Sequence, residues 1–77
     1  MMMEANQQAY EQAVRVLPIR LRQEAYSLPL GERERAEELR LRCGRPLTAV
    51  LPEGERVLGR EPVTGRDLEQ LLELASR

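Results

Sequence analysis

Apolar side chains recur at helical spacing over the first part of the chain, at Ala9, Tyr10, Ala13, Val14 and Leu17. This spacing predicts an amphipathic helix up to Leu17, with Ala9, Ala13 and Leu17 on one apolar face and glutamate and glutamine on the exposed side. Pro18 ends this helix because the residue before a proline is pushed out of the helical region.

A second helix is predicted directly after the first. Pro18 suits the first position of a helix, where its missing N–H costs nothing. Leu21, Ala25 and Leu28 then share one face, and Pro29 closes the helix. The following stretch from Leu30 to Glu38 is highly charged and is expected to hold one further helical turn.

At Leu39 the period changes from helical spacing to alternation. Leu39–Cys43 alternates apolar and polar residues, which predicts a half-buried strand. After a turn at 44–46, Leu47–Leu51 is a second predicted strand, and a Pro-Glu-Gly turn at 52–54 leads to a third at Glu55–Leu58. Such short connections favour antiparallel neighbours.

The last segment begins with a helix-capping pattern. Thr64 stands three residues before Asp67, and Val63 and Leu68 occupy the positions of a hydrophobic staple. Leucines continue at helical spacing beyond Leu68, and no internal repeat is evident along the chain. The 77 residues therefore predict a single small α+β domain, with two N-terminal helices, a three-stranded antiparallel sheet and one C-terminal helix.

Composition limits the chemistry of this domain. The chain has 12 arginines, no lysine, 13 acidic residues and no histidine, giving a net charge of −1, and it has neither phenylalanine nor tryptophan, so thirteen leucines must supply most of the core. Without histidine, and with one cysteine, it lacks His/Cys zinc sites, Ser–His and Cys–His pairs and internal disulfides. Without lysine it lacks a Walker-type phosphate loop. We expect the chain itself not to be an enzyme and to hold no cofactor or metal.

Arginines gather in the predicted sheet. Arg40, Arg42 and Arg45 lie between Leu39 and Val50, a segment without any acid, and alternation places Arg40 and Arg42 opposite the leucine face. Guanidinium groups suit phosphate or carboxylate contacts. The competing interpretation is a solvated face that is partly neutralised by nearby acids, namely Glu37, Glu38, Glu53 and Glu55.

Two other groups of residues favour structural roles. Cys43 continues the inward alternation, so we expect a small buried hydrophobe rather than a reactive thiol. A lone cysteine also fits a reducing cytoplasm. The acids Glu32, Glu34, Glu37 and Glu38 are expected to form a solvated face rather than a metal site.

The segment Glu38-Leu39-Arg40-Leu41-Arg42-Cys43-Gly44-Arg45-Pro46-Leu47 resembles the E-[IL]-R-L-R-x-G-R-P-L motif of the stage III sporulation protein AA family. Leu17-Pro18-x-x-Leu21-Arg22 is similar to a second stretch of that family, and Val63-Thr64-x-x-Asp67-Leu68 to a third. The resemblance extends over about residues 16–76. Cys43 departs from it, because the family usually has valine there.

The resemblance implies the N-terminal domain of a longer P-loop ATPase, similar to secretion and pilus-retraction ATPases, which binds ATP and Mg²⁺ in a motor domain outside these 77 residues. It implies sporulation as the process and a cytoplasmic location at the inner face of the mother-cell membrane. The implied partners are the chain's own ATPase domain, neighbouring subunits and membrane channel proteins. Arg56 is the closest match to an arginine that reaches the nucleotide phosphates, whereas the motif assigns no role to Arg40, Arg42 and Arg45.

Two other functions compete with this one. The arginine face could belong to a small nucleic-acid-binding module, although the near-neutral charge and the lack of sheet aromatics disfavour nucleic acid. The leucine-rich helices could instead serve a ligand-free oligomerisation domain.

Overall fold

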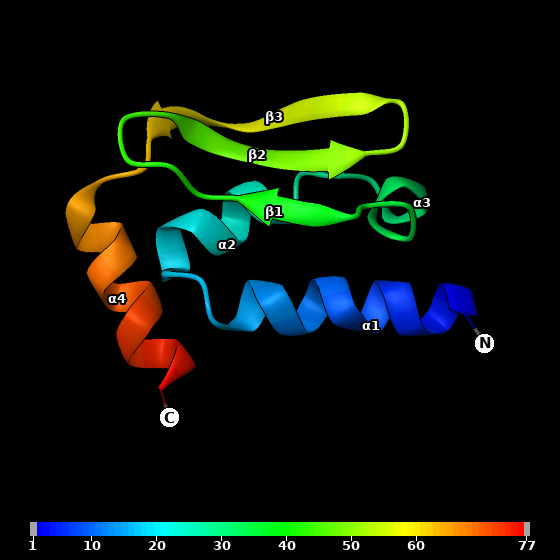
Figure 1. The fold of residues 1–77 in the computed structure, drawn as a ribbon, viewed down its shortest axis with the longest axis horizontal. Coiled ribbons are helices and arrows are strands. Elements are labelled where there is room, and N and C mark those ends of the chain that lie inside the picture. Colours follow the sequence, from blue (N-terminus) through cyan, green and yellow to red (C-terminus); the bar gives the residue numbers. More distant parts are fainter. Residues whose placement is uncertain (1, 77) are drawn as a thin grey trace.

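Helices cover one face of a three-stranded sheet, and the last helix stands at the side (Figure 1). The computed structural model describes the backbone of residues 2–76 and the side chains of residues 9–76. The elements follow one another as α1 (Met2–Arg15), α2 (Ile19–Ala25), α3 (Leu30–Arg33), β1 (Glu38–Arg40), β2 (Pro46–Leu51), β3 (Gly54–Pro62) and α4 (Gly65–Ala75). The sheet is antiparallel in the order β1-β2-β3. The predicted α+β fold class is confirmed. No helix within residues 2–76 combines the length and the apolar character needed to cross a bilayer.

The core lies between α1, α2 and the inner face of the sheet, and its buried side chains are Tyr10, Val14, Leu17, Leu21, Ala25, Leu28, Leu47, Ala49 and Val63. Tyr10 donates a hydrogen bond from its hydroxyl to the carbonyl of Ala25 over 2.7 Å, and burial raises the pKa of Tyr10 to about 12. The prediction that Ala9 and Ala13 face the core is wrong, because both are exposed. The helix instead turns its larger side chains inward, since burying them removes more apolar surface from water.

Two successive Leu-Pro corners connect the first three helices, and they form a short repeat that the sequence did not reveal. Pro18 and Pro29 precede their helices with nearly the same backbone angles, φ −53°, ψ 149° and φ −57°, ψ 150°. Arg22 donates hydrogen bonds of 2.8 Å to the carbonyls of Leu17 and Arg15. Arg33, eleven residues later, donates hydrogen bonds of 2.7 Å to the carbonyls of Leu28 and Tyr26. Each arginine thus satisfies carbonyls at the end of the preceding helix.

The strand predicted for residues 39–43 is shorter in the structure, because β1 ends at Arg40. Gly44 adopts a positive φ of 87°, a conformation that other residues rarely take. Its N–H donates to the carbonyl of Val63 over 2.8 Å, and the N–H of Val63 donates to the carbonyl of Arg45 over 2.8 Å. These bonds hold the turn against the junction of β3 and α4. The predicted burial of Cys43 is therefore wrong: its side chain is exposed at this turn.

The third strand is longer than its predicted range of residues 55–58. β3 extends to Pro62, with a register shift opposite Pro46–Thr48. The shift lies beside Gly59, which is buried against the carboxylate of Glu24. A Cβ at this position would lie 2.5 Å from Glu24 Oε1, so a larger residue would require the Glu24 side chain to move.

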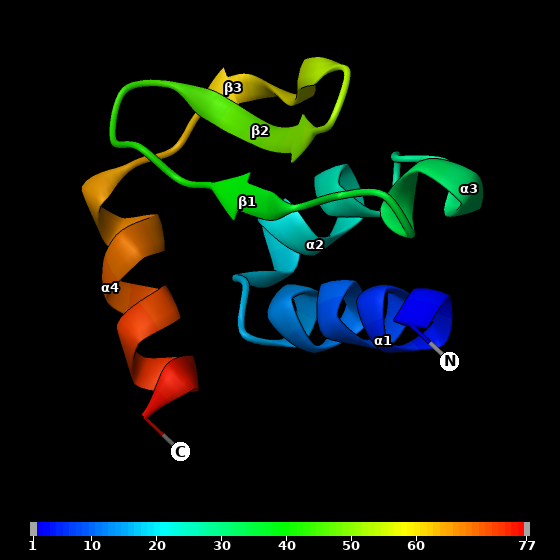
Figure 2. The ribbon, with the colours of Figure 1, turned by 45° about the vertical axis from the view of Figure 1, so that its right-hand side comes forward.

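Helix α4 begins as the capping pattern predicts. The Thr64 hydroxyl accepts from the N–H of Asp67, and the Asp67 carboxylate accepts from the N–H of Thr64, which completes a capping box. From there the helix runs away from the sheet (Figure 2). Leu68 and Leu71 still pack against the core, whereas Leu72 is 67% exposed.

Candidate functional site

The structure brings Arg40, Arg42 and Arg45 together around one small hollow at the end of β1. The hollow has a volume of about 40 Å³ and is completed by Pro46, Thr48 and Glu55. This is room for a water molecule or for one small polar group. The three arginines thus form a local cluster, but their surroundings differ.

Arg40 is paired with acids of the sheet. The register places Arg40 opposite Thr48, and Glu38 and Glu55 lie in the neighbouring row on either side of Val50. Arg40 Nε donates to Glu38, and Nη1 donates to Glu55 Oε2 over 2.6 Å. The hydrogen bond to Glu38 raises the pKa of Arg40 above its ordinary value. Its positive charge is therefore compensated inside the domain.

Arg42 and Arg45 are both exposed and flank Gly44 in the turn. Among the residues with described side chains, 9–76, no carboxylate lies within 4 Å of either guanidinium. The backbone that holds them is fixed by the two hydrogen bonds to Val63. Within the described part of the chain, the turn therefore presents two guanidinium groups that have no carboxylate partner. We refer to residues 41–45 as the arginine turn.

Arg56 lies on the opposite side of the sheet from Arg40. Its strand partner is Ala49, which is buried, so that row of the sheet faces the helices. Arg56 Nη2 lies 2.6 Å from Glu32 Oε1, in helix α3. The structure thus separates Arg56 from the other three candidate arginines and places an acid of the chain itself against it.

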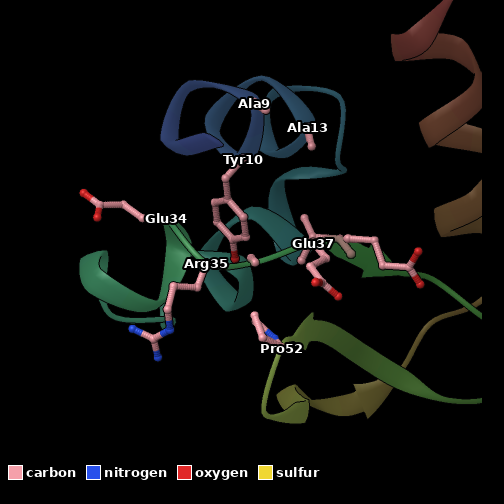
Figure 3. Close-up of a pocket in the computed structure, with 10 residues that line it drawn as sticks. Ala9, Tyr10, Ala13, Glu34, Arg35, Glu37 and Pro52 are labelled. Atoms are coloured by element: carbon pink, nitrogen blue, oxygen red, sulfur yellow. The ribbon is translucent and has the colours of Figure 1, made fainter. Parts of the chain in front are cut away.

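A larger groove opens between α1 and the segment that joins α3 to β1 (Figure 3). Its volume is about 750 Å³, and its apolar lining includes Ala9, Tyr10, Ala13, Leu39 and Pro52. Acids line it as well, namely Glu34, Glu37 and Glu38. We refer to this feature as the acidic groove. The sequence analysis missed this groove because it placed Ala9 and Ala13 in the core; the acid-rich stretch after Leu30 was the signal that the sequence offered.

The acids of the groove differ in their pairing. Glu38 accepts from Arg40, and Arg35, the arginine that lines the groove, donates instead to Glu53 over 2.8 Å. Within residues 9–76, no arginine lies within 4 Å of Glu34 or Glu37. Figure 3 shows Glu34 pointing out of the groove, on the other side of Tyr10 from Glu37, so the two acids do not converge.

A polar cluster centred on Arg20 was also missed. Arg20 binds Asp67 directly, and its Nη1 lies 3.9 Å from Glu24 and 3.9 Å from Glu61. Burial would raise the pKa of the Asp67 carboxyl, but hydrogen bonds from Thr64 and Arg20 outweigh burial and lower it. Local patterns could not show this cluster because Arg20 and Asp67 are 47 residues apart. It joins α4 to the rest of the domain.

In the described part of the chain, no three acidic or cysteine side chains come together in a way that could hold a metal ion. Two of the four acids considered from the sequence lie against arginines instead, Glu32 against Arg56 and Glu38 against Arg40.

Comparison of the chain with protein-family models, with curated proteins and with solved structures finds no match.

Proposed function

We propose that this chain is a non-catalytic N-terminal interaction domain of a sporulation-channel ATPase that resembles the secretion ATPases. The arginine turn is its contact surface for the rest of that machine. The observation that carries the proposal is the pair Arg42 and Arg45, exposed on a fixed turn without a carboxylate partner among residues 9–76. The electrostatic attraction between such guanidinium groups and a partner is strongest where the contact excludes water.

The rigidity of the turn supports a contact role. Gly44 permits the positive φ of the turn, the hydrogen bonds to Val63 fix the position of the loop, and Pro46 restricts the exit into β2. A preorganised surface loses less conformational entropy when it binds than a mobile loop does.

The motifs that carry the resemblance contain two kinds of residue, those that stabilise the fold and those whose side chains have no ion pair within the described domain. Arg22 caps α1, and Thr64 and Asp67 cap α4, so both of these stretches serve the fold. Gly44 serves the turn. Arg42 and Arg45 have no such internal role among the described residues, which leaves them available for an external contact.

The proposed partners are the ATPase domain that holds ATP and Mg²⁺, the neighbouring subunits and the membrane channel proteins, at the cytoplasmic face of the mother-cell membrane. Arg56 could reach nucleotide phosphates only after leaving Glu32. We therefore expect the 77 residues alone to bind ATP weakly or not at all. A micromolar dissociation constant from calorimetry would contradict this expectation.

The parentage is tested first by the reading frame beyond Arg77, in which we expect a G-x-x-x-x-G-K-[ST] stretch. In the protein that this frame encodes, R42Q/R45Q should lower the rate of ATP hydrolysis, whereas the control R60Q/R66Q, at two exposed arginines elsewhere, should not. A frame without a phosphate loop, or equal rates in all three proteins, would contradict the proposal.

The nucleic-acid alternative receives less support from the geometry. Both tyrosines lie on the helical side of the domain, in α1 and just after α2, so neither can stack a base on the sheet. Arg40 is already compensated by two acids. A gel-shift series with random DNA and RNA at low salt would revive this alternative if a shift appeared.

A further inference from the structure

Three arginine side chains converge on one hollow at the outer face of the sheet. Buried side chains of β2 lie on either side of Thr48 along the strand, so Thr48 faces away from the helices. The register places Arg40 opposite Thr48, and Arg42 and Arg45 line the same hollow from the arginine turn, which connects β1 to β2 (Figure 1). Folding thus gathers three like charges around one small space.

The lining of this hollow carries an excess of positive charge. Three arginines and one acid, Glu55, line it. Glu55 accepts from Arg40 Nη1 over 2.6 Å, and Glu38 accepts from the same arginine. Arg42 and Arg45 have no carboxylate within 4 Å among residues 9–76. Within the described part of the chain, two of the three cations therefore lack a negative partner.

The size of the hollow limits the anion that it can take. Its volume is about 40 Å³. One enclosed water molecule needs about 10–15 Å³, so the hollow has room for a group of a few heavy atoms. A tetrahedral oxyanion is of this size, whereas a sugar or a base is too large. The rest of a larger ligand would have to lie outside the hollow.

We propose that this hollow binds a single phosphate group, with Arg42 and Arg45 as its main contacts and Arg40 as the third cation. A guanidinium group matches phosphate oxygens with two parallel hydrogen bonds. A phosphate group carries a charge of about −1.5 to −2 and three acceptor oxygens, so it can meet cations from the strand and from the turn together. A carboxylate has one charge and two oxygens in one plane, so it would leave one of the two unpartnered arginines without an anion.

This inference rests on the contact role proposed for the arginine turn, and it names the chemical group that the turn takes. The group can be inorganic phosphate or the terminal phosphate of a small monoester, because only the phosphate itself enters the hollow. The site is separate from the nucleotide contact considered for Arg56, which lies on the opposite side of the sheet against Glu32.

NMR titration of the 77-residue chain at constant ionic strength tests the site. Sodium phosphate should shift the amide signals of the arginine turn in a saturable way, with a millimolar dissociation constant because the site is exposed. Sodium acetate should produce no saturable shift. If glycerol 3-phosphate also saturates the site, the ligand is the phosphate group of a larger molecule as well, and if it does not, the ligand is the free ion. Equal binding of acetate, or no saturation by either phosphate, would overturn the proposal.

Removal of the two unpartnered cations should abolish most of the binding. R42Q/R45Q should weaken phosphate binding by about tenfold, since two exposed charge pairs are lost. The control R60Q/R66Q removes two exposed arginines elsewhere and should bind phosphate as the unaltered chain does. Unchanged binding in R42Q/R45Q would contradict the assignment.

Removal of the acid should have the opposite effect. E55Q takes the negative charge out of the lining and should bind phosphate about threefold more tightly. The control E53Q makes the same change at an acid of similar exposure, 52% against 57%, that pairs with Arg35 outside the hollow. A misfolded variant would not gain affinity, so this result is independent of stability. Equal affinities of E55Q and E53Q would contradict the assignment.

The titration and the ATPase assay can fail separately. If R42Q/R45Q lowered the rate of ATP hydrolysis but the chain did not bind phosphate, the contact role would stand and the phosphate site would be rejected. If the chain bound phosphate and hydrolysis were unaffected, the phosphate site would stand and the proposed function would be rejected.

Discussion

The arginines of the helical layer and those of the arginine turn differ in what surrounds their guanidinium groups. Arg20, Arg22 and Arg33 each bind groups of their own chain, either carboxylates or the carbonyls at helix ends. The guanidinium groups of Arg42 and Arg45 have no carboxylate within 4 Å among residues 9–76. Arginine is the only basic side chain of the sequence. In the helical layer these three arginines serve the fold, whereas the arginine turn holds two exposed guanidinium groups around one hollow.

The choice of arginine rather than lysine follows from the same comparison. Arg22 and Arg33 each contact two carbonyls through different nitrogens of one planar group. A guanidinium presents five donors in a fixed arrangement, whereas an ammonium is a compact point charge. The planar geometry of arginine therefore suits the capping of two carbonyls by one side chain.

The largest effect is expected at the helical layer, from R20M. This change leaves Asp67, which is only 7% exposed, without its cationic partner. We expect the free energy of unfolding to fall by about 2–3 kcal/mol, less than for a fully buried pair because Arg20 is partly exposed. Urea denaturation would measure the loss, with R60M as the control. If R20M and R60M lowered the free energy of unfolding equally, the distinction between arginines that stabilise the fold and exposed arginines would be wrong.

A somewhat smaller loss is expected from G59A, which tests the packing of the same cluster. The added methyl would meet the carboxylate of Glu24 and force it away from Arg20. Overpacking of this kind costs about 1–2 kcal/mol, at the lower end because the obstacle is the end of a side chain. In the E24A background the substitution should cost much less, and equal costs in both backgrounds would contradict the contact.

The two Leu-Pro corners should respond alike. R22M and R33M each remove hydrogen bonds to carbonyls at a helix end, so each should lower the free energy of unfolding by about 1 kcal/mol. Thermal denaturation followed by circular dichroism would compare them. Unequal losses would show that the corners are alike in geometry but not in energy.

Acid should weaken the attachment of α4. The folded pKa of Asp67 lies below its ordinary value of 3.8, so the unfolded chain binds a proton more readily. The stabilisation is therefore complete above about pH 5 and is lost as the pH falls through 4 toward the folded pKa. D67N should show a shallower loss of stability between pH 5 and pH 3 than the unaltered chain, and parallel curves would contradict this role. E69Q, at an exposed acid of the same helix with no arginine within 4 Å among residues 9–76, is the matched control.

The smallest effect on stability is expected at the arginine turn. R42Q/R45Q removes no described contact, so the free energy of unfolding should change by less than about 0.5 kcal/mol. The same denaturation series measures it. A loss comparable to that of R20M would show that these arginines also serve the fold.

Much of the secondary structure was predictable because the interactions that set it are local. The capping box joins Thr64 and Asp67, three residues apart, and the prolines act on their direct neighbours. The alternation in β2 was sufficient to assign its inner face, with Leu47, Ala49 and Leu51 buried. The alternation over residues 39–43 wrongly predicted a buried Cys43, because hydrogen bonds to Val63, twenty residues further along, hold this segment as a turn.

The sequence by itself determined the element types, the proline breaks between the first helices and the capped start of α4, since each depends on residues within a few positions of one another. The tertiary structure alone decided which arginines are compensated. Their acidic partners lie far along the chain, 15 residues away for Arg40 and Glu55 and 47 for Arg20 and Asp67. A charge is available to a partner only when folding brings no opposite charge to it, and that depends on distances in space that local spacing does not contain.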